Sequence, residues 1–143
     1  MQTAQYCNTA LQAVHGERVV LQCEDMREAD MQNIDAVTIL DALHYIPHVD
    51  QDRLLDRIRA ALGSDGLLIA RVGDATGGWR FAFSQIVDRI VASLRCGRYV
   101  STWCRPLTEW LGALESRGFS VQVLPMSRGT FFANFLLICR VVK

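Results

Sequence analysis

The sequence lacks the features that mark several common functional classes. Lysine plus arginine and aspartate plus glutamate balance at 15 each, so the chain has no excess of basic residues for binding nucleic acid. No apolar run approaches the length of a membrane span. Residues 1–13 lack the basic start and apolar core of a signal peptide. We therefore expect a cytoplasmic protein with no nucleic-acid partner and no membrane span.

Cysteine is present without any pattern. The five cysteines, at positions 7, 23, 96, 104 and 139, include no C-x-x-C pair. An odd, scattered set is typical of reduced thiols in a cytoplasm rather than of a disulfide framework or a zinc site. The sequence therefore predicts no metal centre.

Glycine is missing where nucleotide-binding proteins usually need it. No glycine precedes Gly16, and no G-x-G occurs anywhere in the chain. Dinucleotide-binding folds use a glycine fingerprint so that the backbone can approach the pyrophosphate closely. Its absence counts against an NAD-dependent oxidoreductase.

The most informative stretch present is Ile34 to Pro47, I-D-A-V-T-I-L-D-A-L-H-Y-I-P. Its apolar run 36–40 predicts a strand of a parallel sheet, buried on both faces. Such sheets bind ligands beyond the carboxyl ends of their strands, so Asp41, His44 and Tyr45 should lie at the rim of a site. Alternatively, Asp41 caps the next turn and His44 is an ordinary rim histidine.

Hydrophobic periodicity predicts a single α/β domain over residues 1–143. The predicted helices are 4–14, one capped by Asp50 and ended by a turn at 63–66, 79–94, and one beginning at 105–107. The predicted strands are 19–23, 35–40, 67–72, 119–124 and 132–142. Alternation of strand and helix indicates a mainly parallel sheet. The last two strands are joined by about five residues, too few for a parallel crossover, so they should pair antiparallel.

Several segments in this order resemble motifs of the class I methyltransferases that use S-adenosylmethionine. Residues 35–47 resemble the family's fourth motif, 53–72 the helix and strand after it, 18–26 the third motif, and 105–121 the last helix and sixth strand. The resemblance implies a partial Rossmann-like sheet, mainly parallel with an antiparallel C-terminal strand, flanked by helices. It also implies methyl transfer to a small-molecule or lipid-like acceptor, with S-adenosylmethionine as cofactor.

The sequence departs from this family at the glycine-rich first motif, which is absent together with the first strand and the acidic end of the second. We therefore expect an N-terminally incomplete methyltransferase domain, with weak or no cofactor binding by residues 1–143 alone. The strands at 18–23 and 35–41 would then each expose a hydrogen-bonding edge. Either 18–23 pairs directly with 35–41, or a second copy of the chain covers the edges; we favour the second, a homo-oligomer. The alternative is a degenerate, non-catalytic methyltransferase-like subunit that acts as a binding or structural partner.

Residues 125–134, P-M-S-R-G-T-F-F-A-N, are also similar to methyltransferase-like proteins of bacterial aryl-polyene and related lipid pathways. This similarity favours a phenolic or acyl-chain substrate.

The resemblance implies cofactor-binding roles for four residues. Asp25 would hold the adenine amino group, with Met26 lining the adenine pocket, and Leu40 and Asp41 would border the methionine part and the sulfonium. A carboxylate attracts that cation. Alternatively, Asp25 only caps the following turn.

His44 and Tyr45 would face the acceptor, and His44 is the candidate general base because histidine titrates near neutral pH. A structural role for His44 is the alternative. The substrate lip would comprise Asp74, Trp79, Arg80 and Arg128, although a tryptophan such as Trp79 is more often part of a core than a substrate contact.

Overall fold

The structure, a computed structural model, describes residues 20, 22, 24–74, 101–126 and 134–142. The chain divides into two compact units, Met1–Asp30 and Met31–Lys143, and each is described by itself. The predicted helices at 4–14 and 79–94 lie outside the described residues. Of the predicted strand at 19–23, only Val20 and Gln22 are described; neither is in a strand, so the prediction is wrong for these two. A single domain over residues 1–143 stays a prediction.

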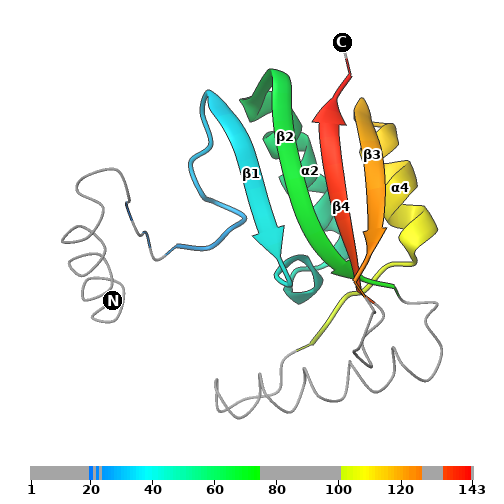
Figure 1. Cartoon of the computed structure of the whole chain (residues 1–143). Helices are drawn as coiled ribbons and strands as arrows, with labels where there is room; N and C mark the ends of the chain where they lie inside the picture. Colours follow the sequence, from blue (N-terminus) through cyan, green and yellow to red (C-terminus); the bar gives the residue numbers. More distant parts are fainter. Residues whose placement is uncertain (1–19, 21, 23, 75–100, 127–133, 143) are drawn as a thin grey trace. The chain divides into compact units, whose positions relative to one another are not determined.

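The described part of the second unit contains a four-stranded sheet with the order β1-β2-β4-β3 (Figure 1). Its strands are β1 (Ile34–Leu40), β2 (Leu62–Gly73), β3 (Phe119–Pro125) and β4 (Asn134–Val141). β1 pairs parallel with β2, and β4 runs antiparallel to both β2 and β3. The predicted strands at 35–40, 67–72 and 119–124 are confirmed, and that at 132–142 is confirmed over Asn134–Val141; residues 132 and 133 lie outside the described residues. The mainly parallel α/β sheet with an antiparallel C-terminal strand is also confirmed.

β2 begins earlier than the sequence indicates. Ile34 pairs with Leu62 and Ala36 with Leu67, so residues 63–66 bulge out of the ladder between these two pairs. The predicted turn at 63–66 is thus built into the strand as an irregularity, and Leu62 directly follows the preceding helix.

Two helices, α2 (His48–Ala61) and α4 (Leu107–Glu115), lie on the same face of the sheet, behind it in Figure 1. Each buries an apolar stripe against strands whose alternate side chains point the same way. Each fully buried aliphatic side chain contributes roughly 1.5–3 kcal/mol. The buried apolar residues of these helices and strands are Leu54, Leu55, Ile58, Leu62, Leu68, Ala70, Val72, Trp110, Leu114, Phe119, Leu137 and Cys139.

The helix ends differ in part from the sequence-based expectation. α2 begins at His48 after Pro47, so Asp50 lies inside the first turn and is not the cap. A carboxylate in a first turn still favours the helix, because it faces the positive end of the helix dipole. α4 begins after Pro106 as expected. The turn after α4 contains Gly118 at a φ of 77°, which suits glycine because it lacks a Cβ.

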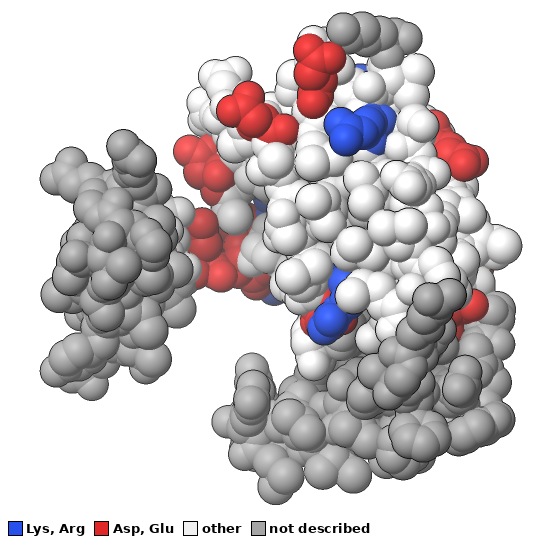
Figure 2. Space-filling view, viewed as in Figure 1, with Lys and Arg blue, Asp and Glu red and all other residues white. Residues whose placement is uncertain are grey.

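β1 is more exposed than a strand buried on both faces. Ala36, Thr38 and Leu40 are exposed, and no residue of β1 is fully buried, so that expectation is wrong. The cause is that β1 pairs with β2 alone among the described strands, and α2 and α4 cover the opposite face. Among the described residues, the face of the sheet away from α2 and α4 presents mainly uncharged side chains, interrupted by a few charged ones (Figure 2).

Candidate functional site

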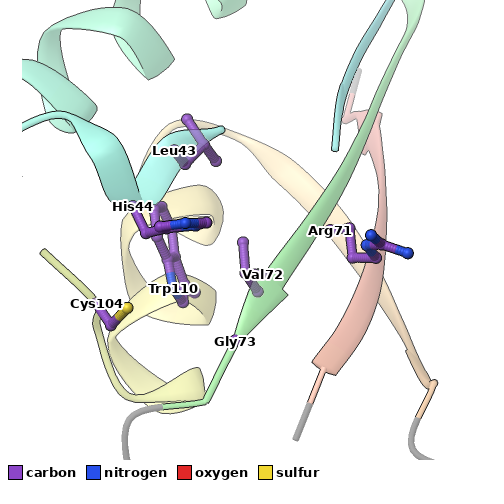
Figure 3. A pocket seen from close by; sticks show the side chains of 7 residues that line it. All are labelled: Leu43, His44, Arg71, Val72, Gly73, Cys104 and Trp110. Carbon is purple, nitrogen blue, oxygen red and sulfur yellow. The ribbon is translucent and has the colours of Figure 1, made fainter. Parts of the chain in front are cut away.

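A small cavity lies beyond the carboxyl ends of β1 and β2, where parallel sheets hold ligands (Figure 3). Its volume is about 10 Å³, which is room for one water molecule. It is lined by Leu43, His44, Arg71, Val72, Gly73, Cys104 and Trp110. These residues come from the turn after β1, the end of β2, the segment leading into α4, and α4 itself, which contributes Trp110. Elements distant in sequence therefore converge at the predicted edge.

His44 lies in η2 (Leu43–Tyr45), a single 3-10 turn after β1. Asp41 has a φ of 54°, and this left-handed residue turns the chain sharply out of the strand. Leu43 is 2% exposed and anchors the turn in the core. The His44 and Tyr45 rings lie 4.1 Å apart between centroids; Tyr45 is exposed, whereas His44 lines the cavity. The structure thus brings the two predicted catalytic residues together at the rim.

Asp41 forms an ion pair with Arg71, through Nε to Oδ1 at 2.7 Å and Nη2 to Oδ2. Arg71 is the one charged residue of the apolar strand segment 67–72, and this pair accounts for its charge. Figure 3 shows the Arg71 side chain extending from β2 on the side opposite to Val72 and His44. A sulfonium beside Asp41 would therefore also meet a guanidinium cation.

Asp74 interacts with the amino end of α4. Its Oδ1 accepts a hydrogen bond of 3.1 Å from the Leu107 amide, and a carboxylate at a helix amino terminus is stabilising. The other residues of the predicted lip, Trp79, Arg80 and Arg128, lie outside the described residues. A role for this lip in substrate binding stays a prediction.

Asp25 and Met26 belong to the first compact unit. The Asp25 carboxylate accepts hydrogen bonds from the Arg27 amide at 3.0 Å and from the Arg27 guanidinium at 2.6 Å. These bonds lower the pKa of Asp25 to about 2. The main-chain carbonyl of Asp25 also accepts hydrogen bonds from the amides of Glu28 and Ala29. Asp25 therefore begins a turn, as the alternative interpretation expects. Adenine binding by Asp25 and Met26 stays a prediction.

Sequence reasoning did not assign Cys104, Trp110, Gln51 or Arg105 to the site. Cys104 and Trp110 line the same cavity as His44. Arg105 is 7% exposed and bonds Asp52 through Nη1 at 3.1 Å and Nη2 at 2.8 Å. It thereby fastens the segment before α4 to α2. No local pattern in the sequence reveals the Arg105–Asp52 contact, because these two residues are 53 positions apart along the chain.

A second, open pocket of about 370 Å³ is lined by Met31, Gln32, Asn33, Arg57, Ala60 and Ala61, none of which lines the cavity at His44. At the ends of β1 and β2, His44 lines the small cavity, and the Asp41 carboxylate is already paired with Arg71. Within 24–74, 101–126 and 134–142, no group of histidine, cysteine, aspartate and glutamate could hold a metal ion. No helix in these ranges is long and apolar enough to cross a membrane.

The chain is similar in structure to several solved methyltransferases. It matches the pyocyanin biosynthetic protein PhzM over 99% of its length, with a TM-score of 0.68 and 17% identity. It matches the mitomycin 7-O-methyltransferase MmcR over 98%, with a TM-score of 0.68 and 22% identity. The fold is that of the class I methyltransferases.

A third structure with this fold is the magnesium protoporphyrin IX methyltransferase from Synechocystis PCC 6803 with bound SAH. Here the match covers 96% of the chain with a TM-score of 0.66 and 15% identity. The chain spans 41% of PhzM, 40% of MmcR and 59% of the Synechocystis enzyme. No protein-family model and no curated protein matches the sequence. Similarity at these identities shows the fold, and it confirms the fold that the methyltransferase resemblance implies.

Proposed function

We propose that this chain carries the acceptor side of an S-adenosylmethionine-dependent methyl-transfer site for a small-molecule or lipid-like acceptor. The observation that carries the proposal is the position of His44. It lies in the turn directly after β1 and lines a cavity at the carboxyl edge of a methyltransferase-like sheet. The similarity of residues 125–134 to aryl-polyene pathway proteins supports a phenolic or acyl-chain acceptor. The unpatterned cysteines support a cytoplasmic location.

In this proposal His44 removes the proton from an acceptor hydroxyl, and Tyr45 contacts the acceptor from the exposed side of η2. S-adenosylmethionine, when bound, supplies an electrophilic methyl group. The protein then has to align the nucleophile and accept its proton, and these are the tasks of positioning and general-base catalysis. Nε2 of His44 is buried, and the residue lines the cavity at the ends of β1 and β2.

The cofactor roles are part of the same proposal. Asp25 and Met26 hold the adenine, and Leu40 and Asp41 border the methionine part. Arg71 balances the charge of Asp41 and so weakens its attraction for a sulfonium. For residues 1–143 alone we expect weak or no S-adenosylmethionine binding, because the cavity beside His44 has room for only one water molecule and no G-x-G occurs in the sequence.

The test compares the 143-residue chain with the longest native polypeptide that contains it. Both are titrated with S-adenosylmethionine in a calorimeter and assayed for release of S-adenosylhomocysteine with a panel of phenols and acyl-chain alcohols. We expect binding and turnover from the longer polypeptide and little of either from the chain alone. If no native form binds S-adenosylmethionine or turns over an acceptor, the proposal is overturned. Micromolar binding of S-adenosylmethionine by the 143-residue chain alone would contradict the weak binding that we expect of it.

A second candidate is a non-catalytic methyltransferase-like subunit. The Asp41–Arg71 ion pair favours it, since this pair leaves no uncompensated carboxylate beside the expected sulfonium position. Cofactor binding without turnover by any native form would favour this candidate over the enzyme.

We also propose that the chain forms a homo-oligomer. The support is the strand edge of β1, which carries no proline or lysine and has no second strand partner among the described residues. Such edges recruit further strands. Sedimentation at micromolar concentration should give twice the 16.1 kDa mass of the chain or more, and a monomer at every concentration would contradict this expectation.

A further inference from the structure

Gln51 is a completely buried polar residue in the first turns of α2, with 0% of its surface exposed. Its side-chain nitrogen donates to three main-chain carbonyls, those of Leu43 at 3.0 Å, Ile46 at 3.1 Å and Trp103 at 2.8 Å. An amide has two protons, so the three acceptors share them. Buried side-chain amides are uncommon unless they have such partners.

The orientation of this amide follows from its surroundings. Exchanging its oxygen and nitrogen would place the oxygen against three carbonyl oxygens, which accept hydrogen bonds and donate none. In the observed orientation Oε1 is buried without a hydrogen-bond partner among the described residues. Among the described residues, the Gln51 side chain therefore forms hydrogen bonds only through its NH₂ group.

The three carbonyls belong to residues that flank His44 in the chain or bond to its backbone. Leu43 directly precedes it, Ile46 closes the 3-10 turn after it, and Trp103 donates its own amide to the His44 carbonyl at 2.8 Å. Gln51 thus ties both ends of η2 to α2, and it ties the same Trp103 that holds the His44 backbone. A shift of this amide would move the turn that carries His44.

We propose that Gln51 is the positioning residue of His44. Its side-chain amide sets the orientation of η2, and through it the place of the imidazole at the cavity. The inference rests on the proposed function in giving His44 a chemical role, but the positioning itself is measurable in the 143-residue chain without any cofactor.

The test uses Gln51→Leu, which keeps most of the volume and removes the donors. Nuclear magnetic resonance follows amide hydrogen exchange at residues 43–46 and the ring shifts of His44. The chain has three histidines, and His48 on the surface of α2 is the internal reference. We expect exchange at 43–46 to rise by about tenfold or more through the lost hydrogen bonds, with altered His44 ring shifts and unchanged His48 shifts.

Cys139→Ala is the matched control for a general loss of stability, because Cys139 is buried on β4 in the sheet. If this variant changes exchange at 43–46 and the His44 ring as much as Gln51→Leu does, the proposal is overturned. If Gln51→Leu does not fold, Gln51→Glu decides. It loses both amide N–H donors, and a protonated carboxyl group replaces only one of them. Exchange at 43–46 should therefore still exceed the parental rate, and an unchanged rate overturns the proposal.

In the longest native polypeptide, Gln51→Leu should lower kcat by up to about a hundredfold, as expected for a misplaced catalytic group. The KM for S-adenosylmethionine should stay near the parental value. If the parent has no turnover, the proposed function fails, and the resonance measurements still decide whether Gln51 positions His44. A raised KM with unchanged kcat would overturn positioning.

Discussion

Arg71 binds Asp41 through two guanidinium nitrogens at the point where β1 and β2 end, with Nε 2.7 Å from Oδ1. The Asp41 amide also donates to the Arg71 carbonyl at 3.4 Å. The strand ends are therefore joined by both main chain and side chain. Asp41 was expected to attract a sulfonium cation, and in the structure its charge is already compensated. His44, three residues later, lies on the other side of β2 (Figure 3).

The Asp41–Arg71 pair should add little to stability, because its side chains are 39% and 36% exposed. We expect a coupling free energy below about 1 kcal/mol, decreasing with salt. Urea unfolding of the parent, Asp41→Asn, Arg71→Gln and the double variant measures this coupling free energy. Asparagine is a suitable replacement at position 41 because it tolerates the left-handed φ. A coupling several times larger that salt does not alter would mean that the pair is shielded from water.

Asp52 should stabilise the fold at neutral pH. The Arg105 hydrogen bond lowers the pKa of the Asp52 carboxyl below its ordinary 3.8. A lowered folded-state pKa means that the contribution is complete above pH 3.8 and is lost as pH falls through the folded pKa. We expect Asp52→Asn to cost about 2 kcal/mol at pH 7, less than for a fully buried pair because Asp52 is 40% exposed.

Urea unfolding from pH 7 down to pH 2 checks this expectation. Asp56→Asn is the matched control, since Asp56 pairs with Arg117 at 2.6 Å but is 61% exposed. Its cost should stay below about 1 kcal/mol. If Asp52→Asn lowers the free energy of unfolding by the same amount at pH 2 as at pH 7, the charge of Asp52 does not contribute to stability.

The buried thiol of Cys139 should make the fold less stable in alkali. Burial raises its pKa from 9.0 to about 12. Above pH 9 the unfolded chain loses this proton while the folded chain keeps it. Deprotonation thus stabilises the unfolded state, and the free energy of unfolding falls as pH rises. The pH dependence of the unfolding free energy between pH 9 and 11 should therefore be shallower in Cys139→Ala. Equal pH dependence of the unfolding free energy in the parent and in Cys139→Ala would contradict a raised pKa for Cys139.

His44→Ala should lower turnover by roughly a hundredfold or more in a native form that binds the cofactor, as loss of a general base does. The dissociation constant for S-adenosylmethionine should change little. His48→Ala is the matched control, because His48 is exposed at the start of α2. Turnover within a few-fold of the parent for His44→Ala would leave His44 with a structural role.

The elements of the sheet could be predicted where neighbouring residues carry the information. The strand at 35–40 follows from an apolar run, and the helix from Leu107 follows from a proline before a periodic stripe. The antiparallel pairing of β3 and β4 follows from a short connection. The burial of β1 could not be predicted, because an apolar run does not reveal whether a second strand lies beside it.

The sequence by itself determined that a histidine follows the first described strand, and that a methyltransferase-like sheet presents it at a carboxyl edge. Only the tertiary structure decided what surrounds that histidine. Gln51 stands in a polar stretch and would be expected at the surface, but its amide reaches the Trp103 carbonyl, 52 residues along the chain. Arg71 meets Asp41 across 30 residues. A strand or helix is favoured by contiguous residues, whereas the partner of a buried polar group depends on how distant segments pack.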